Sequence, residues 1–204
     1  MKKLLLSLLL LLSLGFLSGC ALEKRPEPDH LALMVDAAVS GDAEKGRAAA
    51  LAYREALARD GGGGTPVSYD ELSLLARFLT SEAGDGWRTE ELRLCAGEVL
   101  LNRVASPEFP DTLEEVLAGE GWTPEDVSLP SRACAEAALR LLLGERMLDE
   151  KVVYRSDRAQ GGGVYATFCD RRQRFTYFCL TEHPELYLVQ KDLPLFVDAR
   201  AEMG

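Results

Sequence analysis

The segment EELRLCAGEVLLNRV, residues 90–104, constrains the fold more than any other part of the sequence. On a helix its apolar side chains fall on almost every side, and a helix that is apolar all round is a buried one. Thr89 is a suitable N-cap for it, and Glu90 and Glu91 suit the positive end of a helix. We therefore predict a central helix with other elements packed around it.

Apolar periodicity predicts further helices over residues 30–39, 43–59, 69–82, 112–118 and 131–144, with Asp42, Ser68, Thr112 and Ser131 as N-cap or first residues. Runs of β-branched and aromatic residues at 152–154, 164–168 and 175–179 predict short strands, because QGGG and DRRQR separate them as turns. The expected fold is α+β, a mainly helical domain with a small antiparallel sheet.

The first nineteen residues, MKKLLLSLLLLLSLGFLSG, have the layout of a secretory signal, with Lys2 and Lys3 before an apolar run. The sequence LSGC that ends at Cys20 resembles a bacterial lipobox. This resemblance implies cleavage before Cys20 and diacylglycerol on its sulfur. The alternatives are an ordinary signal peptide and an uncleaved anchor. We expect an exported lipoprotein held on the outer face of the bacterial membrane.

The remaining chain divides into a tether and helical arm, residues 20–66, and a domain over residues 67–204. Four glycines at 61–64, followed by Pro66, end the arm, which we expect to be a helical hairpin that spaces or braces the domain. Without Lys2 and Lys3 the chain has 21 basic and 33 acidic residues, a net charge of −12. This charge argues against a nucleic-acid partner and against electrostatic adhesion to an anionic membrane.

Four cysteines follow Cys20. Cys95 and Cys134 fall on apolar helical positions, which favours buried free thiols. Cys169 and Cys179 flank the segment DRRQRFTYF and are candidates for a disulfide across a hairpin. The chain has two histidines and no CxxC pair, so we predict no metal site and no cofactor.

Glu82 continues the apolar stripe of Leu75 and Leu79 and precedes Gly84 and Gly86. A carboxyl group on a core-facing position loses part of its hydration, which favours its neutral form and makes it a candidate general acid. The glycines would let a ligand approach closely. The other interpretation is a frayed last turn in which Glu82 faces water, and periodicity does not decide between them.

Glu98 lies inside the helix expected to be buried. It is either a structural carboxylate satisfied by Arg93, Arg103 or backbone, or a second carboxylate for chemistry. Asn102 is expected to bond the backbone of a neighbouring loop. Two tryptophans, at 87 and 122, follow glycine and would either stack on a sugar or close the edge of the core.

The stretches LLARFLTSEAGDGW, ELRLCAGEVLLNRVASPEFPDTLEEVL and GGGVYATF…TYFC…HPELY resemble the cell wall hydrolase family of spore-cortex-lytic enzymes, the SleB/CwlJ type, relatives of the lytic transglycosylases. The resemblance spans residues 68–187. It implies a lysozyme-like fold with one catalytic glutamate at the end of a helix, which matches Glu82. The expected activity is cleavage of the β-1,4 bond between N-acetylmuramic acid and N-acetylglucosamine in peptidoglycan, by lytic transglycosylation or hydrolysis.

The same resemblance leads us to expect that the cleft between the helices and the sheet is lined by Trp87, Tyr154, Gly161, Gly162, Gly163, Tyr165 and Tyr177. Hydrolysis would use a second carboxylate from Asp85, Glu91 or Glu98. The chain departs from the family where it reads EAGDGWRTEELR and GEGWTPEDV. These departures leave open a rival, a non-catalytic peptidoglycan-binding lipoprotein. A third possibility is a cysteine-dependent peptidase or amidase built on Cys169 or Cys179.

Overall fold

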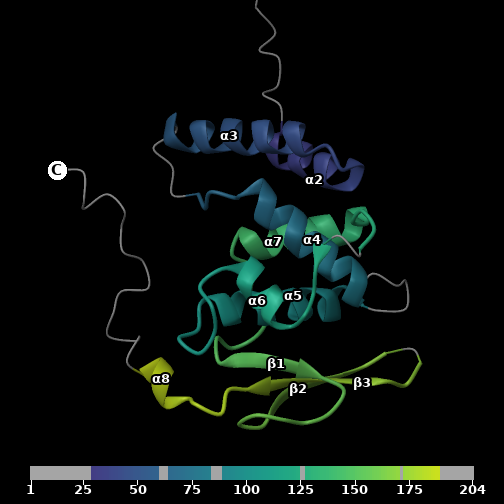
Figure 1. Ribbon diagram of the computed structural model, residues 1–204, viewed down its shortest axis with the longest axis vertical. Coiled ribbons are helices and arrows are strands. Elements are labelled where there is room, and N and C mark those ends of the chain that lie inside the picture. The colour runs from purple at the N-terminus through teal and green to yellow at the C-terminus, as the bar shows by residue number, and fades with distance from the viewer. Residues whose placement is uncertain (1–28, 60–63, 84–88, 125–126, 171, 189–204) are drawn as a thin grey trace, which may run out of the picture.

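The computed structural model describes residues 29–59, 64–83, 89–124, 127–170 and 172–188. Figure 1 shows an arm, a helical layer and a sheet stacked in that order. The arm comprises α2 (His30–Ser40) and α3 (Ala43–Arg59). The helical layer comprises α4 (Tyr69–Ala83), α5 (Glu90–Val104), α6 (Leu113–Gly119) and α7 (Arg132–Leu142). The sheet comprises β1 (Val152–Ser156), β2 (Val164–Cys169) and β3 (Phe175–Leu180), and the short helix α8 (Glu185–Leu188) follows it. The predicted α+β class with a small antiparallel sheet is confirmed, whereas α8 was not predicted.

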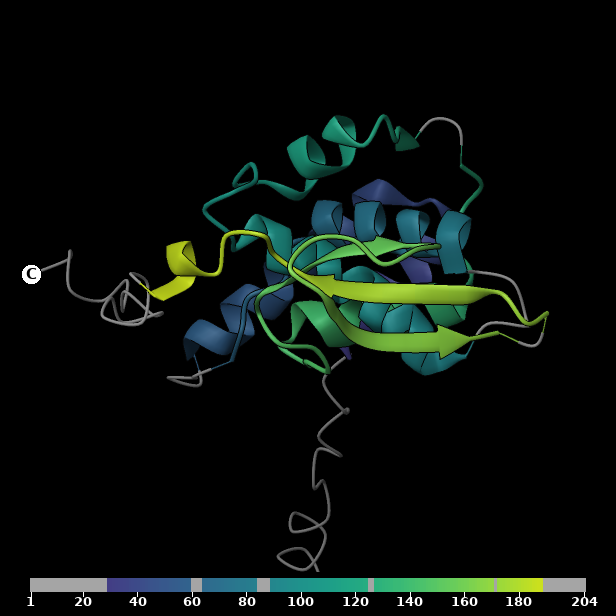
Figure 2. The same cartoon turned by 90° about the horizontal axis from the view of Figure 1, so that it is seen from below.

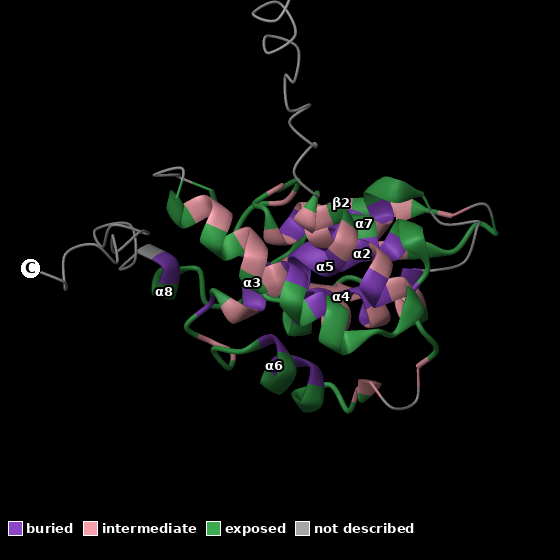
Figure 3. Cartoon of the chain, turned by 90° about the horizontal axis from the view of Figure 1, so that it is seen from above, coloured by how far each residue is buried: buried purple, intermediate pink, exposed green. Residues whose placement is uncertain are grey.

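Helix α5 is the buried centre that its composition predicts. It contacts α4, α6, α7 and β1, and its buried side is visible at the middle of Figure 3. The hydroxyl of Thr89 accepts a hydrogen bond from the backbone N–H of Leu92 at 3.2 Å, as expected of an N-cap. The other predicted caps also accept bonds from the first turn of their helices, namely Asp42 from Lys45, Ser68 from Glu71, Thr112 from Glu115 and Ser131 from Cys134.

The arm braces the helical layer. Met34, Ala37 and Ala38 of α2 are almost fully buried in the core that also holds the apolar face of α4. Helix α3 crosses α4 at Gly46, where an added Cβ would lie 2.1 Å from the ring of Tyr69. Only a residue without a side chain permits this approach, so the glycine fixes how closely the arm docks.

The three strands have the order β1-β3-β2, and both pairings are antiparallel. Phe178, at the centre of β3, is fully buried against Leu92, Cys95, Val99 and Val152. In Figure 2 the sheet lies in front of the helices, which cover one of its faces. The other face carries half-exposed aromatic side chains, including Tyr165 and Phe175.

Two neighbouring residues of α5 hold β1 in place. The amide nitrogen of Asn102 donates to the carbonyl oxygens of Asp149 (3.0 Å) and Val152 (3.1 Å). Arg103 Nε donates to the carbonyl oxygen of Val153 at 2.6 Å. The expected role of Asn102 as a bond to a neighbouring backbone segment is confirmed, and these bonds fix the strand that carries Arg155.

The candidate disulfide between Cys169 and Cys179 is absent from the structure. Cys169 pairs with Phe175, whereas Cys179 lies four residues farther along β3. At about 3.3 Å per residue this spacing separates the two Cα atoms by roughly 13 Å, and a disulfide needs less than about 7 Å. The four described cysteines are free thiols, and Cys95 and Cys134 are buried as predicted.

Candidate functional site

Glu82 lies in the last turn of α4. Leu75 and Leu79, on the same side of the helix, are fully buried, whereas the side chain of Glu82 is 39% exposed. The apolar stripe therefore ends at the edge of the core, and its last member is a carboxylate that solvent reaches. This placement is the one expected of a group at the rim of a cleft.

Arg155 of β1 is the partner of this carboxylate. Its Nη2 donates to Glu82 Oε2 at 2.7 Å, and its side chain is only 18% exposed. The guanidinium carbon lies 5.6 Å from the ring centroid of Phe78, one turn before Glu82 on α4. Arg155 pairs with Phe178 in the sheet and shares its inward-facing side. Arg155 was not predicted from the sequence, because no local pattern links positions 73 residues apart.

A pocket of about 260 Å³ opens at this ion pair, between the end of α4, the end of β1 and the β2–β3 hairpin. Its walls are formed by Glu82, Arg155, Ser156, Asp157, Asp170, Arg174, Phe175 and Thr176. Charged side chains are thus concentrated at one end of the sheet. No hydrogen bond or ion pair holds the exposed side chain of Asp157 within the described part of the chain.

Asp170 is a structural carboxylate of the hairpin. Its Oδ1 accepts from the backbone N–H of Arg172 (2.7 Å) and of Arg174 (3.0 Å), and Oδ2 pairs with Arg174 Nε at 3.1 Å. Burial alone would raise the pKa of Asp170, but the two backbone N–H groups and the Arg174 guanidinium together lower it. Asp170 therefore shapes this wall of the pocket and is committed to the turn.

The predicted second carboxylates do not join the pocket among the described residues. Glu91 is exposed in the first turn of α5. Glu98 is fully buried, and its carboxylate accepts from the backbone N–H of Met147 (2.7 Å) and Leu148 (3.0 Å). Burial raises the pKa of Glu98 despite these two bonds. Of the two interpretations of Glu98, the structure supports the structural one, with backbone as the partner. Asp85 lies outside the described residues.

The predicted lining residues are spread along the sheet. Trp87 lies outside the described residues, as does Cys20. Tyr154 packs edge to face on Phe109 with the ring centroids 6.3 Å apart, and Tyr177 lies 6.3 Å from Phe175. None of the predicted lining residues that the structure describes lines the Glu82 pocket, whereas Phe175, which was not predicted, does.

Two of the three glycines at 161–163 make room for the chain itself, whereas a Cβ on Gly163 would meet nothing within 4 Å. A Cβ on Gly161 would lie 2.3 Å from the carbonyl oxygen of Leu180, and one on Gly162 would lie 2.2 Å from that of Thr181. The backbone N–H of Gly162 donates to Leu180 at 2.9 Å. Gly161 and Gly162 therefore let the chain pack closely at the end of the sheet opposite to Phe175.

Trp122 closes the edge of the core beside the site. Its Nε1 donates to Ser81 Oγ at 3.1 Å, and its ring meets Phe78 edge to face at 6.0 Å. Phe78 thus contacts both Trp122 and Arg155. A cavity of about 650 Å³ lies on the Trp122 side, between α4 and α6.

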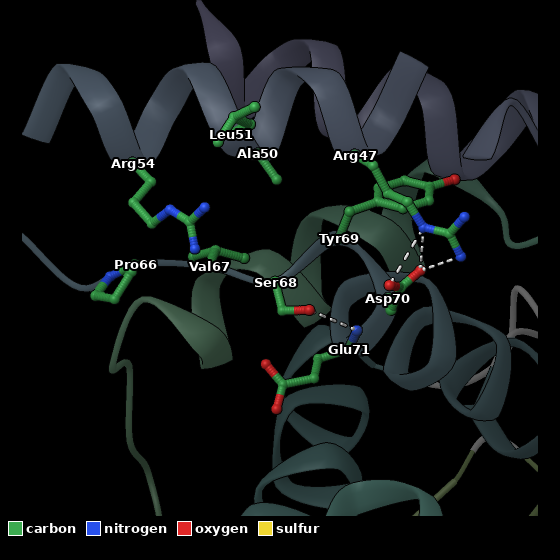
Figure 4. Close-up of a pocket in the computed structure, with 10 residues that line it drawn as sticks. All are labelled: Arg47, Ala50, Leu51, Arg54, Pro66, Val67, Ser68, Tyr69, Asp70 and Glu71. Carbon is green, nitrogen blue, oxygen red and sulfur yellow. Dashed lines mark hydrogen bonds and ion pairs between the residues drawn. The ribbon is translucent and has the colours of Figure 1, made fainter. Parts of the chain in front are cut away.

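A further pocket of about 490 Å³ separates α3 from the start of α4 (Figure 4). Arg47 and Asp70 face each other across one end of it, with Nη2 and Oδ1 2.9 Å apart. No predicted site residue lines this pocket. It is larger than the pocket at Glu82, but a pair of solvent-exposed opposite charges offers no evident chemistry.

The cysteine-dependent rival finds no catalytic pair in the described chain. Cys169, the exposed thiol, donates to the carbonyl oxygen of Asp170 at the hairpin end of the sheet. His183 follows the opposite end of β3, and its Nδ1 lies 3.2 Å from Glu185 Oε1. A cysteine nucleophile needs its base within hydrogen-bonding reach. Cys169 is separated from His183 by the length of the strand, and Cys179 is buried and makes no hydrogen bond to His183 among the described residues.

No protein-family model matches the sequence, no curated protein is similar enough to match it, and no solved structure matches its fold. Within the described ranges, no group of histidine, cysteine and acidic side chains has the arrangement of a metal site. None of the helices described is both long and apolar enough to cross a membrane.

Proposed function

We propose that the chain cuts the glycan strands of peptidoglycan, at the bond between N-acetylmuramic acid and N-acetylglucosamine, with Glu82 as the acid and base. The observation that carries the proposal is the position of Glu82, a partly exposed carboxylate at the end of a core helix that opens into a pocket beside a small sheet. A lysozyme-like arrangement, as the sequence resemblance implies, places its catalytic glutamate in this way.

The proposed reaction needs one carboxyl group. Protonated Glu82 donates its proton to the glycosidic oxygen while the bond from this oxygen to the muramyl C1 breaks. The resulting carboxylate then takes the proton of the muramyl C6 hydroxyl, and the C6 oxygen bonds to C1 to close a 1,6-anhydro ring. Glu82 ends protonated, as it began, so no cofactor is consumed.

Hydrolysis is the variant in which water replaces the C6 hydroxyl. Hydrolytic glycosidases of the two-carboxylate type place the second group about 5–9.5 Å from the first. Asp157 shares the pocket with Glu82 and has no partner among the described residues, so it is the carboxylate that such a mechanism would use. Glu98 is committed to the backbone of Met147 and Leu148.

The second candidate function is peptidoglycan binding without cleavage. One observation favours it: Glu82 is engaged in an ion pair with Arg155, whereas the first step of cleavage needs its carboxyl group free to contact the glycosidic oxygen. In either case we propose that lipid on Cys20 keeps the protein at the outer face of the membrane, where peptidoglycan is its partner.

Mass spectrometry of the material released from purified peptidoglycan tests these alternatives. Anhydromuramyl ends are the result expected of transglycosylation, and new reducing ends would indicate hydrolysis with the same glutamate. Binding to the polymer with no soluble product would contradict cleavage and leave the binding function.

A further inference from the structure

Arg155 poses a problem for the proposed chemistry. In the free protein it is held by Glu82 at 2.7 Å. When Glu82 takes up the proton that it is to donate, this negative charge disappears. A guanidinium that is 18% exposed then lacks its anionic partner, and an unpaired charge that is poorly hydrated is costly.

Arg155 has little freedom to escape into solvent. Its guanidinium lies against the ring of Phe78. Its backbone is paired with Phe178 of the central strand. Two residues earlier in β1, the carbonyl oxygen of Val153 accepts a hydrogen bond from Arg103 of α5. Among the described residues, Glu82 is the one acceptor that the Arg155 side chain bonds.

The protein itself offers few replacement anions. Asp170 lines the pocket but is bonded to two backbone N–H groups and to Arg174. Asp157 is exposed, two residues after Arg155 at the end of β1, and is the remaining carboxylate of the pocket. A partner brought by the substrate is the other source of negative charge.

We infer that the substrate group next to the scissile bond carries a carboxylate, which takes Arg155 from Glu82 and frees the Glu82 carboxyl group to contact the glycosidic oxygen. Arg155 is thus a positioning residue and the anion receptor of the site. The inference rests on the proposed function and adds a substrate class to it. Muramic acid has such a group, a lactyl carboxyl at C3, which is free in peptide-free strands and amide-linked where a stem peptide is attached.

The test compares three substrates: peptide-free glycan strands with lactyl carboxylates, the same strands with these carboxylates converted to methylamides, and strands with stem peptides. A charge-assisted bond to Arg155 predicts that kcat/KM for the first exceeds that for the second by about tenfold or more. Cleavage of the third above both the first and the second would assign the carboxylate to the stem peptide instead. Equal rates on all three substrates overturn the inference. Equal rates are the result expected if Asp157, and not the substrate, becomes the ion-pair partner of Arg155.

Variants separate the role of Arg155 from a general loss of structure. Arg155→Met is expected to reduce the preference for the carboxylate to about one, with Arg155→Lys retaining part of it, whereas Arg158→Met, at an exposed arginine outside the pocket, keeps the full preference. A preference that persists in Arg155→Met contradicts the inference.

A binding measurement distinguishes failure of this inference from failure of the proposed cleavage. Glu82→Gln releases Arg155, so calorimetry should show that this variant binds carboxylate-bearing strands about tenfold or more tightly than wild type. Methylamide strands should show no such gain, and Glu82→Gln with Arg155→Met should abolish it. If Glu82→Gln binds more tightly but wild type releases no product, the proposed cleavage is refuted and the role of Arg155 as an anion receptor stands. If wild type cleaves but Glu82→Gln binds no more tightly, only the role of Arg155 is refuted.

Discussion

Arg155 Nη2 donates to Glu82 Oε2 at 2.7 Å, and this bond joins the first strand of the sheet to the last turn of α4 across 73 positions of the sequence. The same guanidinium covers the ring of Phe78. The contact therefore ties the sheet to the helical layer at the place where the pocket opens.

The stability of this link is measurable by a double-mutant cycle with Glu82→Gln and Arg155→Met. Because the Glu82 side chain is 39% exposed, water screens the pair, and we expect a coupling energy of about 1 kcal/mol or less. Urea unfolding of the four proteins gives this value. A coupling of several kcal/mol would show that the pair is a structural element first, and would weaken its assignment to a site that opens on binding.

Glu98→Gln should alter stability in a pH-dependent way. Burial raises the pKa of Glu98 in the folded state above its ordinary value of 4.5, so the folded protein binds this proton more tightly than the unfolded chain does. Ionisation of Glu98 therefore lowers the free energy of unfolding as pH rises from 4.5 through the raised pKa. Below about pH 4.5 both side chains are neutral, and we expect wild type and Glu98→Gln to differ by less than about 1 kcal/mol.

Urea unfolding of both proteins between pH 4 and 8 tests this sign. The difference in unfolding free energy, wild type minus variant, should fall with rising pH. A difference that grows with pH would mean that the two backbone N–H groups outweigh burial and lower the pKa of Glu98.

Gly46→Ala should loosen the arm although alanine is the better helix former. The new Cβ would lie 2.1 Å from the buried ring of Tyr69, and such overpacking costs about 1–3 kcal/mol. Gly119→Ala is the matched control, because a Cβ there meets nothing within 4 Å and should leave stability unchanged or slightly higher. Thermal unfolding checks both, and equal midpoints for the two variants would contradict the tight crossing.

Thiol labelling should find one reactive cysteine in the native described chain. Cys169 is exposed, whereas Cys95, Cys134 and Cys179 are buried. Burial also raises the pKa of the Cys95 thiol to about 11, so little of its reactive thiolate exists at neutral pH. Iodoacetamide treatment followed by peptide mapping should label Cys169 alone before unfolding and all three others after it. A Cys169–Cys179 linked peptide under non-reducing conditions would contradict the strand register.

The sequence predicted most elements because their signals are local. A cap such as Thr89 or Ser131 bonds an N–H three residues ahead. The apolar residues on all sides of α5 indicate that the helix is buried, whichever elements pack against it. Strand β1 was expected to end at Tyr154 and extends to Ser156, since the polar residues Arg155 and Ser156 give no strand signal.

The site was only partly predictable, because its members meet through pairing register and strand order. Periodicity singled out Glu82 without deciding whether it faces water, and Arg155, Asp157 and Phe175 join it through the sheet. Register also decides against the candidate disulfide, since spacing along the chain allowed a bridge across the hairpin while the pairing separates Cys169 from Cys179. Helix α8 was not predicted because its four residues are too few to show the apolar periodicity of a helix.

The central claim, that Glu82 supplies the proton for glycan cleavage, is tested most directly by the loss of turbidity of purified peptidoglycan with wild type and Glu82→Gln, each confirmed to be folded. Glu44→Gln, at an exposed position of the arm, serves as the control. Wild type and the control should clear the suspension at the same rate, and Glu82→Gln should be slower by about 100-fold or more. Clearing by Glu82→Gln at the rate of the wild-type protein would contradict the account.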